Sequence, residues 1–79
     1  MVEHQPERKR FVLPVDGHEV TLSYVPRDGK VDMVHTFTPD ALRGRGLARQ
    51  VVEAALAWAE AEGLEVIPSC WYVAKVMDG

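Results

Sequence analysis

The sequence has one cysteine, three histidines, a slight excess of acidic residues and no long hydrophobic run. The single cysteine, Cys70, excludes an internal disulfide and any zinc site built from several cysteines. No apolar stretch approaches the roughly 20 residues of a membrane-spanning helix, and the first ten residues lack the apolar segment of a secretion signal. We therefore expect a cytoplasmic protein without a membrane partner.

The charge balance argues against one class of function, general binding to nucleic acid. Nine Lys and Arg residues stand against 12 Asp and Glu residues, which gives a net charge of -3. An acidic chain is a poor general binder of nucleic acid. The histidines at positions 4, 18 and 35 share no metal-ligand spacing, so no metal site is expected. His4 and His18 are interpreted as bystanders.

What the sequence does contain fits one small folded domain. Its 79 residues are 47% hydrophobic and 27% charged, as in soluble globular proteins. Residues 1–8 are polar and without periodicity, so we interpret them as a flexible N-terminal tail and place a single domain at residues 9–79. The core of so short a chain is thin, which is compatible with a homodimer.

Alternating apolar residues predict three strands near residues 9–15, 18–26 and 30–38. Asp-Gly pairs at positions 16–17 and 28–29 separate them, and Asp-Gly is a strong signal for a tight hairpin turn. The simplest interpretation is an antiparallel meander. The strand parity places His35 on the more apolar side of the third strand.

The second half of the chain is predicted to be helix, strand and helix. Leu47 to Glu62 carries apolar residues at spacings of three and four, and Gly63 is a typical helix stop. Leu64 to Ile67 is predicted to be a short strand parallel to the third one, because a helix connects the two. Residues 69–77 can form a last helix with Ser69 as its N-cap. The fold class is therefore α/β.

The most informative segment is Arg-Gly-Arg-Gly at residues 43–46, between the third strand and the long helix. A helix N-terminus offers unpaired N–H groups that attract phosphate, and glycines let the backbone approach an anion closely. Arginines add charge that pairs with phosphate oxygens. The alternative is a tight loop with solvated arginines. Walker and dinucleotide motifs fit worse, since no Gly-Lys-Ser/Thr follows and Arg49 replaces a third glycine.

Several short landmarks occur in a specific order along the chain. They are Phe11, Tyr24, His35-Thr36, Arg43 to Ala48 and Pro68-Ser69-Cys70. Arg43-x-x-Gly46-x-Ala48 resembles the pyrophosphate-binding loop of GNAT-type acyl-CoA N-acyltransferases. Together the landmarks resemble a minimal single-domain branch of the GNAT-type acyl-CoA N-acyltransferase superfamily, over roughly residues 10–77.

This resemblance implies a fold, a cofactor and a reaction. The fold would be a small GNAT-like mixed sheet, with a three-stranded antiparallel meander, a strand–loop–helix–strand crossover and a short C-terminal helix. The cofactor would be acetyl-CoA, and the acetyl group would pass to an unidentified amine on a protein or small molecule. The acceptor site would be shallow or completed by another chain. The implied cofactor-binding residues are Thr36, Arg43, Gly44, Arg45, Gly46, Leu47 and Ala48.

The resemblance also suggests His35 and Cys70 as a catalytic pair. A histidine titrates near neutrality, which suits proton removal from an ammonium group; the alternative is a half-buried structural histidine. Cys70 is either a buried packing residue or a thiol activated at a helix start, where it could accept the acetyl group. Trp71 and Tyr72 either line an acyl pocket or pack in the core.

A function of another class stays open. The third strand has no glutamate base, and full-length members of the superfamily have further N-terminal elements for the acceptor. Both points favour a CoA-binding or interaction module with little or no catalytic activity. An RNA-binding scaffold that uses the Arg-Gly loop is disfavoured by the acidic charge.

Overall fold

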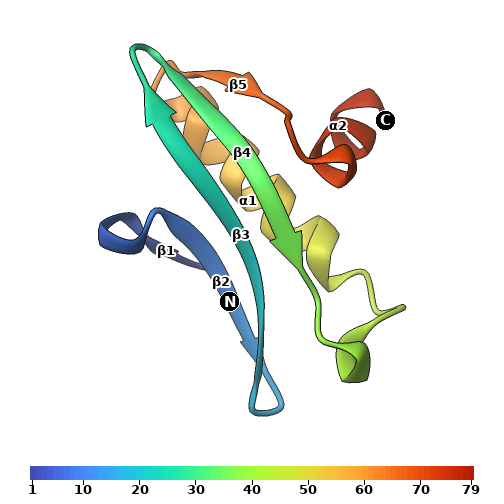
Figure 1. The fold of residues 1–79 in the computed structure, drawn as a ribbon. Coiled ribbons are helices and arrows are strands. Elements are labelled where there is room, and N and C mark those ends of the chain that lie inside the picture. The colour runs from blue at the N-terminus through green and yellow to red at the C-terminus, as the bar shows by residue number, and fades with distance from the viewer.

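One five-stranded mixed sheet organises the computed structural model, which describes residues 1–79 (Figure 1). The strands lie side by side in sequence order, β1 to β5. Three pairings are antiparallel, and β4 pairs with β5 in parallel. The predicted α/β class, meander and parallel crossover are confirmed. The elements are β1 (Glu3–Gln5), β2 (Arg10–Val15), β3 (His18–Arg27), β4 (Lys30–Phe37), α1 (Leu47–Ala61), β5 (Glu65–Ile67) and α2 (Trp71–Asp78), with 3-10 turns η1 (Pro6–Arg8) and η2 (Asp40–Leu42).

The N-terminal residues differ from the expected tail. Glu3–Gln5 form β1, which pairs with β2 in the register His4 to Phe11, and η1 connects the two strands. His4 holds β1 in place, since its Nε2 lies 2.6 Å from the hydroxyl oxygen of Tyr24 and its ring stacks on Phe11 at 4.2 Å. A three-residue strand is too short to show periodicity, so only these tertiary contacts reveal it.

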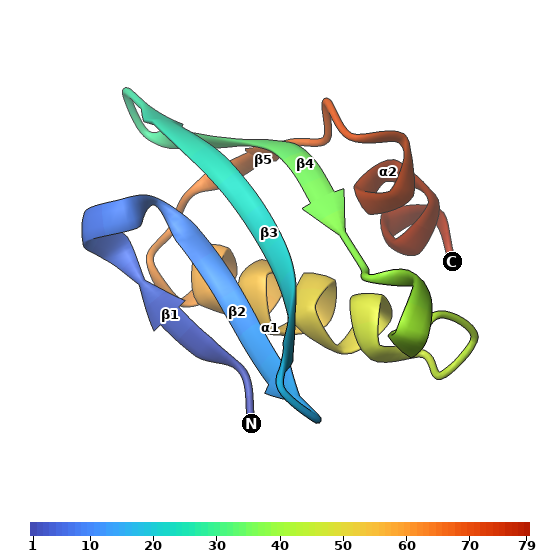
Figure 2. The same cartoon turned by 60° about the horizontal axis from the view of Figure 1, so that its bottom comes forward.

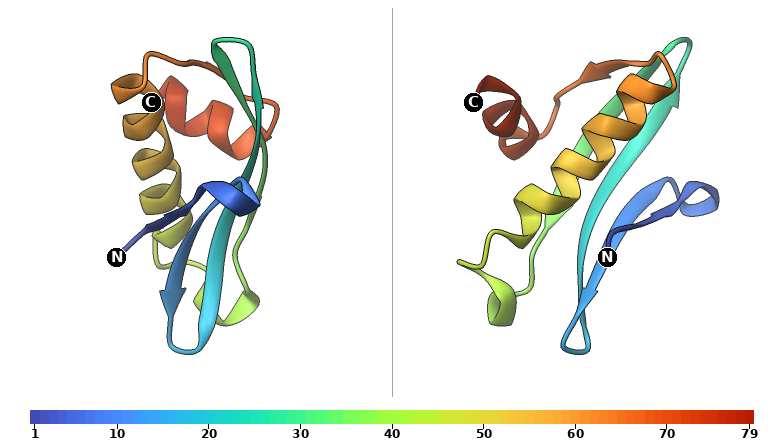
Figure 3. Two further views of the ribbon diagram at one scale, coloured as in Figure 1. Left: turned by 90° about the vertical axis from the view of Figure 1, so that its left-hand side faces the viewer. Right: turned by 180° about the vertical axis from the view of Figure 1, so that it is seen from behind.

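Helix α1 covers one face of the sheet (Figure 2). Its buried side chains recur at helical spacing and pack on the inward residues of β2, β3 and β4. Helix α2 lies on the same side of the sheet, as the left panel of Figure 3 shows, and contributes Val73 and Val76 to the same core. Neither helix combines the length and apolar character needed to cross a membrane.

The start of α2 differs from the prediction. The helix begins at Trp71 with Cys70 as N-cap residue, and no side chain caps it. The N–H of Cys70 donates to the carbonyl of Met33 at 3.0 Å, which holds Cys70 in an extended conformation. This tie to β4 prevents the helix from starting at Ser69, so the predicted Ser69 cap is wrong.

Strands β4 and β5 separate after three paired residues. Their register joins Lys30, Val31 and Asp32 to Glu65, Val66 and Ile67. Beyond Asp32, β4 continues to Phe37 while the chain leaves β5 toward α2 (Figure 1). The second half of β4 therefore has no partner strand on that side, and the loop before α1 lies at its end.

Candidate active site

A cavity of about 530 Å³ lies between the end of β4, the loop before α1 and the start of α2. Six of the seven predicted cofactor-binding residues line it, although they come from two separate segments of the chain. Thr36 projects from β4, and the others belong to the loop and the first turn of α1. The six are Thr36, Arg43, Gly44, Gly46, Leu47 and Ala48.

Four more residues complete the lining, namely Thr38, Leu42, Trp71 and Tyr72. Trp71 is 74% exposed, so it forms a wall of the cavity instead of part of the core. Sequence reasoning missed Leu42, because η2 is too short to predict. Of the two alternatives for Trp71 and Tyr72, Trp71 lines the cavity, and Tyr72 both lines it and packs against the core.

The loop beside this cavity has a row of free backbone donors. No backbone N–H from residue 44 to residue 49 donates to a protein acceptor. Gly44 and Gly46 have φ angles of 81° and 72°, a left-handed conformation that only glycine adopts without strain. Donors of this kind at the N-terminus of a helix form a site for an anion.

The loop arginines are already engaged with carboxylates. Arg43 lines the cavity and pairs with Asp40 at 3.2 Å. Arg45 does not line the cavity, because its guanidinium pairs with Asp16 at the tip of the β2–β3 hairpin, also at 3.2 Å. Both pairs are exposed, and exposed pairs contribute little free energy. The glycines of the loop therefore line the cavity, whereas the Arg45 side chain lies outside it.

Cys70 lies directly behind this cavity. It is 9% exposed, and its Sγ is 3.5 Å from the Oγ1 of Thr36, which lines the cavity. Burial raises the pKa of the Cys70 thiol, but the Thr36 hydroxyl and the backbone N–H groups of Val73, Tyr72 and Thr36 lower it by more. The net effect is a thiol pKa below its ordinary value.

His35 does not lie on the apolar face that the alternation of residues in its strand predicted. The register between β3 and β4 pairs Tyr24 with Met33 but Ser23 with His35, so Val34 is an extra residue in a β-bulge. The bulge reverses the parity of the strand beyond it. Thr36 then faces α1, and His35 is exposed on the opposite face of the sheet. The expected apolar orientation of His35 is therefore wrong.

The two residues suggested as a catalytic pair consequently lie on opposite faces of the sheet. Cys70 has Thr36 as its side-chain partner, and His35 has no side-chain hydrogen bond. No group of three His, Cys, Asp or Glu side chains converges as a metal site would require. The site therefore has free backbone donors and a thiol with a lowered pKa on one face and an exposed imidazole on the other.

Comparisons with known proteins agree with these features. A family model described as GCN5-related N-acetyl-transferase matches residues 10–79. Protein NATD1 of Gallus gallus is 39% identical over 77 residues, which cover 94% of this chain and 70% of that protein. Protein NATD1 of Homo sapiens is 39% identical and covered to 68%, and that of Danio rerio is 35% identical and covered to 70%. The similarity extends over nearly the whole chain.

Proposed function

The chain belongs to the GCN5-related N-acetyl-transferase family, and on this premise we propose that it binds acetyl-CoA and transfers the acetyl group to an amine. The observation that carries the proposal is the row of free N–H groups at residues 44–49, beside a cavity of about 530 Å³. Free amides at a helix start suit a diphosphate. This fit comes from the loop itself and is independent of the family assignment.

The residues that line the cavity are proposed to contact different parts of the cofactor. Gly44 and Gly46 let the backbone approach the diphosphate, and Arg43 adds a charged contact at the rim. Thr36 lies further along β4, where β4 has separated from β5, so it is placed to contact the rest of the cofactor. When bound, acetyl-CoA supplies an acetyl thioester that an unprotonated amine can attack.

Proton transfer is assigned to His35 and Cys70. His35 is exposed on the face opposite α1, where an acceptor has access, so it is proposed to take the proton from the acceptor ammonium. Cys70 is proposed to hold a proton on its Sγ and donate it toward the cavity. Its lowered pKa makes the thiol a better donor, and the hydrogen bond with Thr36 orients it.

Calorimetry with CoA, together with release of free CoA thiol from acetyl-CoA across a panel of amines, tests the proposal. We expect wild type to bind CoA and Gly46→Val to lose binding. Gly63→Val is the matched control, because Gly63 also has positive φ but lies at the far end of α1. If CoA does not bind wild type, or if Gly63→Val loses binding equally, the loop is not the diphosphate site.

One observation favours a second candidate function. His35 and Cys70 lie on opposite faces, so they do not form a contact pair that activates a nucleophile. A CoA-binding module with little catalysis has the same cavity and needs no such pair. Tight CoA binding with thiol release at the uncatalysed rate, for every amine tested, would favour this module over the transferase.

A further inference from the structure

The face of the sheet opposite the helices carries a row of polar side chains. Both helices lie on one side of the sheet (Figure 3), so this face is uncovered. The strand register aligns Gln5 with Arg10, Arg10 with Ser23, and Ser23 with His35. Residues opposite each other on adjacent strands share a face, and adjacent strands are about 4.8 Å apart. Arg10 and His35 therefore stand on one face with their backbones roughly 10 Å apart.

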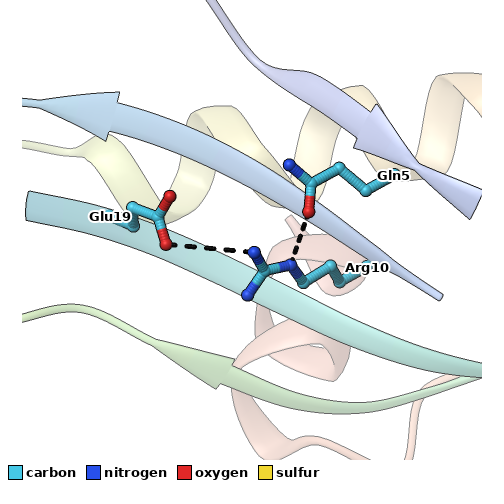
Figure 4. Close-up of polar contacts among 3 residues, drawn as sticks. All are labelled: Gln5, Arg10 and Glu19. Atoms are coloured by element: carbon cyan, nitrogen blue, oxygen red, sulfur yellow. Dashed lines mark hydrogen bonds and ion pairs between the residues drawn. The ribbon is translucent and has the colours of Figure 1, made fainter. Parts of the chain in front are cut away.

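The guanidinium of Arg10 is oriented by its neighbours (Figure 4). Its Nε donates to the Oε1 of Gln5 at 2.7 Å, and one terminal nitrogen lies 4.0 Å from the Oε1 of Glu19. The hydrogen bond to Gln5 fixes one edge of the planar group. The contact with Glu19 is longer than a hydrogen bond. The outer edge of Arg10 therefore retains N–H donors for an external ligand.

A groove of about 700 Å³ occupies this face toward the β2–β3 hairpin. Arg10, Glu19 and Thr21 line it on the side of β2 and β3, and Phe37 lines it on the side of β4. Phe37 is two residues from His35 and pairs with Thr21, so it shares the face with His35. A ligand in the groove thus has Arg10 on one side and Phe37 on the other, and His35 lies just outside the groove, two residues from Phe37 on the same face.

Resting on the proposed function, we propose that this groove holds the acceptor, and that Arg10 selects amines that also carry a carboxylate. The planar guanidinium pairs with a carboxylate through two parallel N–H donors, which an ammonium group cannot match. With its carboxylate on Arg10, a chain of several carbons presents the amine toward His35. Glu19 competes for the same guanidinium, so it weakens carboxylate binding.

Lysine and cadaverine form a matched pair of probes, because cadaverine is lysine without its carboxylate. We expect wild type to acetylate lysine with a kcat/KM roughly tenfold above that for cadaverine, the size of one charge-assisted pair. Arg10→Gln should bring the ratio close to one, and Arg10→Lys should restore only part of it. Glu19→Gln should raise the ratio, because it removes the competing carboxylate. Thermal unfolding verifies that each variant is folded.

A binding experiment tests the groove even without turnover. In NMR titrations without acetyl-CoA, lysine should shift the signals of Arg10 Nε–H and the His35 ring, and cadaverine should not. The proposal is overturned if neither probe shifts these signals, if wild type favours cadaverine, or if Arg10→Gln keeps the preference for lysine. Calorimetry with CoA distinguishes failure of this proposal from failure of the proposed function. If the protein binds CoA but shows none of these effects, the proposed cofactor site stands and the acceptor groove is refuted.

Discussion

The Oγ1 of Thr36 and the Sγ of Cys70 lie 3.5 Å apart, although 34 residues separate them in the sequence. The contact connects β4 to the start of α2 at the place where β4 and β5 have separated. It depends on the bulge at Val34, because in a regular strand of the same sequence Thr36 would lie on the face away from α2. The bulge thus places Thr36 beside the Cys70 thiol and His35 on the other face of the sheet.

Replacing Thr36 should change the acidity of Cys70. Thr36→Val removes the hydroxyl that lowers the pKa of the Cys70 thiol, so that pKa should rise. The pH dependence of thiol alkylation should then shift to higher pH. Thr38→Val is the control, because Thr38 lines the same cavity but has no hydrogen bond with Cys70 and no effect on its pKa. Equal shifts in the two variants would contradict the role of the hydrogen bond.

Alanine at Gly46 should separate backbone strain from ligand binding. Gly46 and Gly63 have φ angles of 72° and 70°, and an added Cβ at either position meets no atom within 4 Å. Each alanine variant should therefore lose about 1 kcal/mol of unfolding free energy from left-handed strain. Only Gly46→Ala should also weaken CoA binding in calorimetry. Unchanged CoA affinity in Gly46→Ala would show that the cofactor does not approach the backbone there.

The two loop arginines should differ in their effect on CoA affinity. Arg45 is paired with Asp16 outside the cavity, so Arg45→Ala should change the dissociation constant by less than about twofold. Arg43 lines the cavity, and Arg43→Ala should weaken binding by about two- to fivefold, as expected for an exposed ionic contact. A larger loss in Arg45→Ala than in Arg43→Ala would mean that Arg45 leaves Asp16 to contact the ligand.

The docking of β1 should depend on pH through His4. Burial lowers the pKa of His4, and the nearby Glu62 opposes this by raising it; the net pKa lies below the ordinary value. The unfolded chain therefore binds the proton more readily, and unfolding free energy should fall as pH drops below about 6.5 and through the folded-state value. Denaturation measured across this range should show a smaller pH dependence in His4→Phe. An unchanged dependence would exclude His4 as the source.

Mass spectrometry distinguishes the two chemical roles of Cys70. If Cys70 donates a proton, protein mixed with acetyl-CoA and no amine should carry no acetyl group on that residue. Cys70→Ala should then lower kcat with little effect on CoA affinity, because Cys70 lies behind the cavity lining. An acetyl adduct on Cys70 that disappears when amine is added would instead establish it as a nucleophile.

Local patterns in the sequence were sufficient for most of the fold. The meander, the long helix ended near Gly63 and the parallel fifth strand follow from periodicity and turn residues, which act over a few positions. The Asp16-Gly17 turn has positive φ at both residues, as a type I′ hairpin requires. The Arg-Gly loop was identified because glycines before a helix have a direct physical meaning.

Long-range packing decided the rest. A bulge adds one residue without a sequence signal, yet it exchanged the faces on which His35 and Thr36 lie and so determined which residue contacts Cys70. Strand β1 is too short for periodicity and is held by the contacts of His4 with Tyr24 and Phe11. The types of the elements and the Arg-Gly loop are therefore determined by residues that are neighbours in the sequence. Hydrogen bonds between distant segments decide on which face of the sheet a side chain lies, where α2 begins and which residues share a site. These bonds exist only in the folded chain.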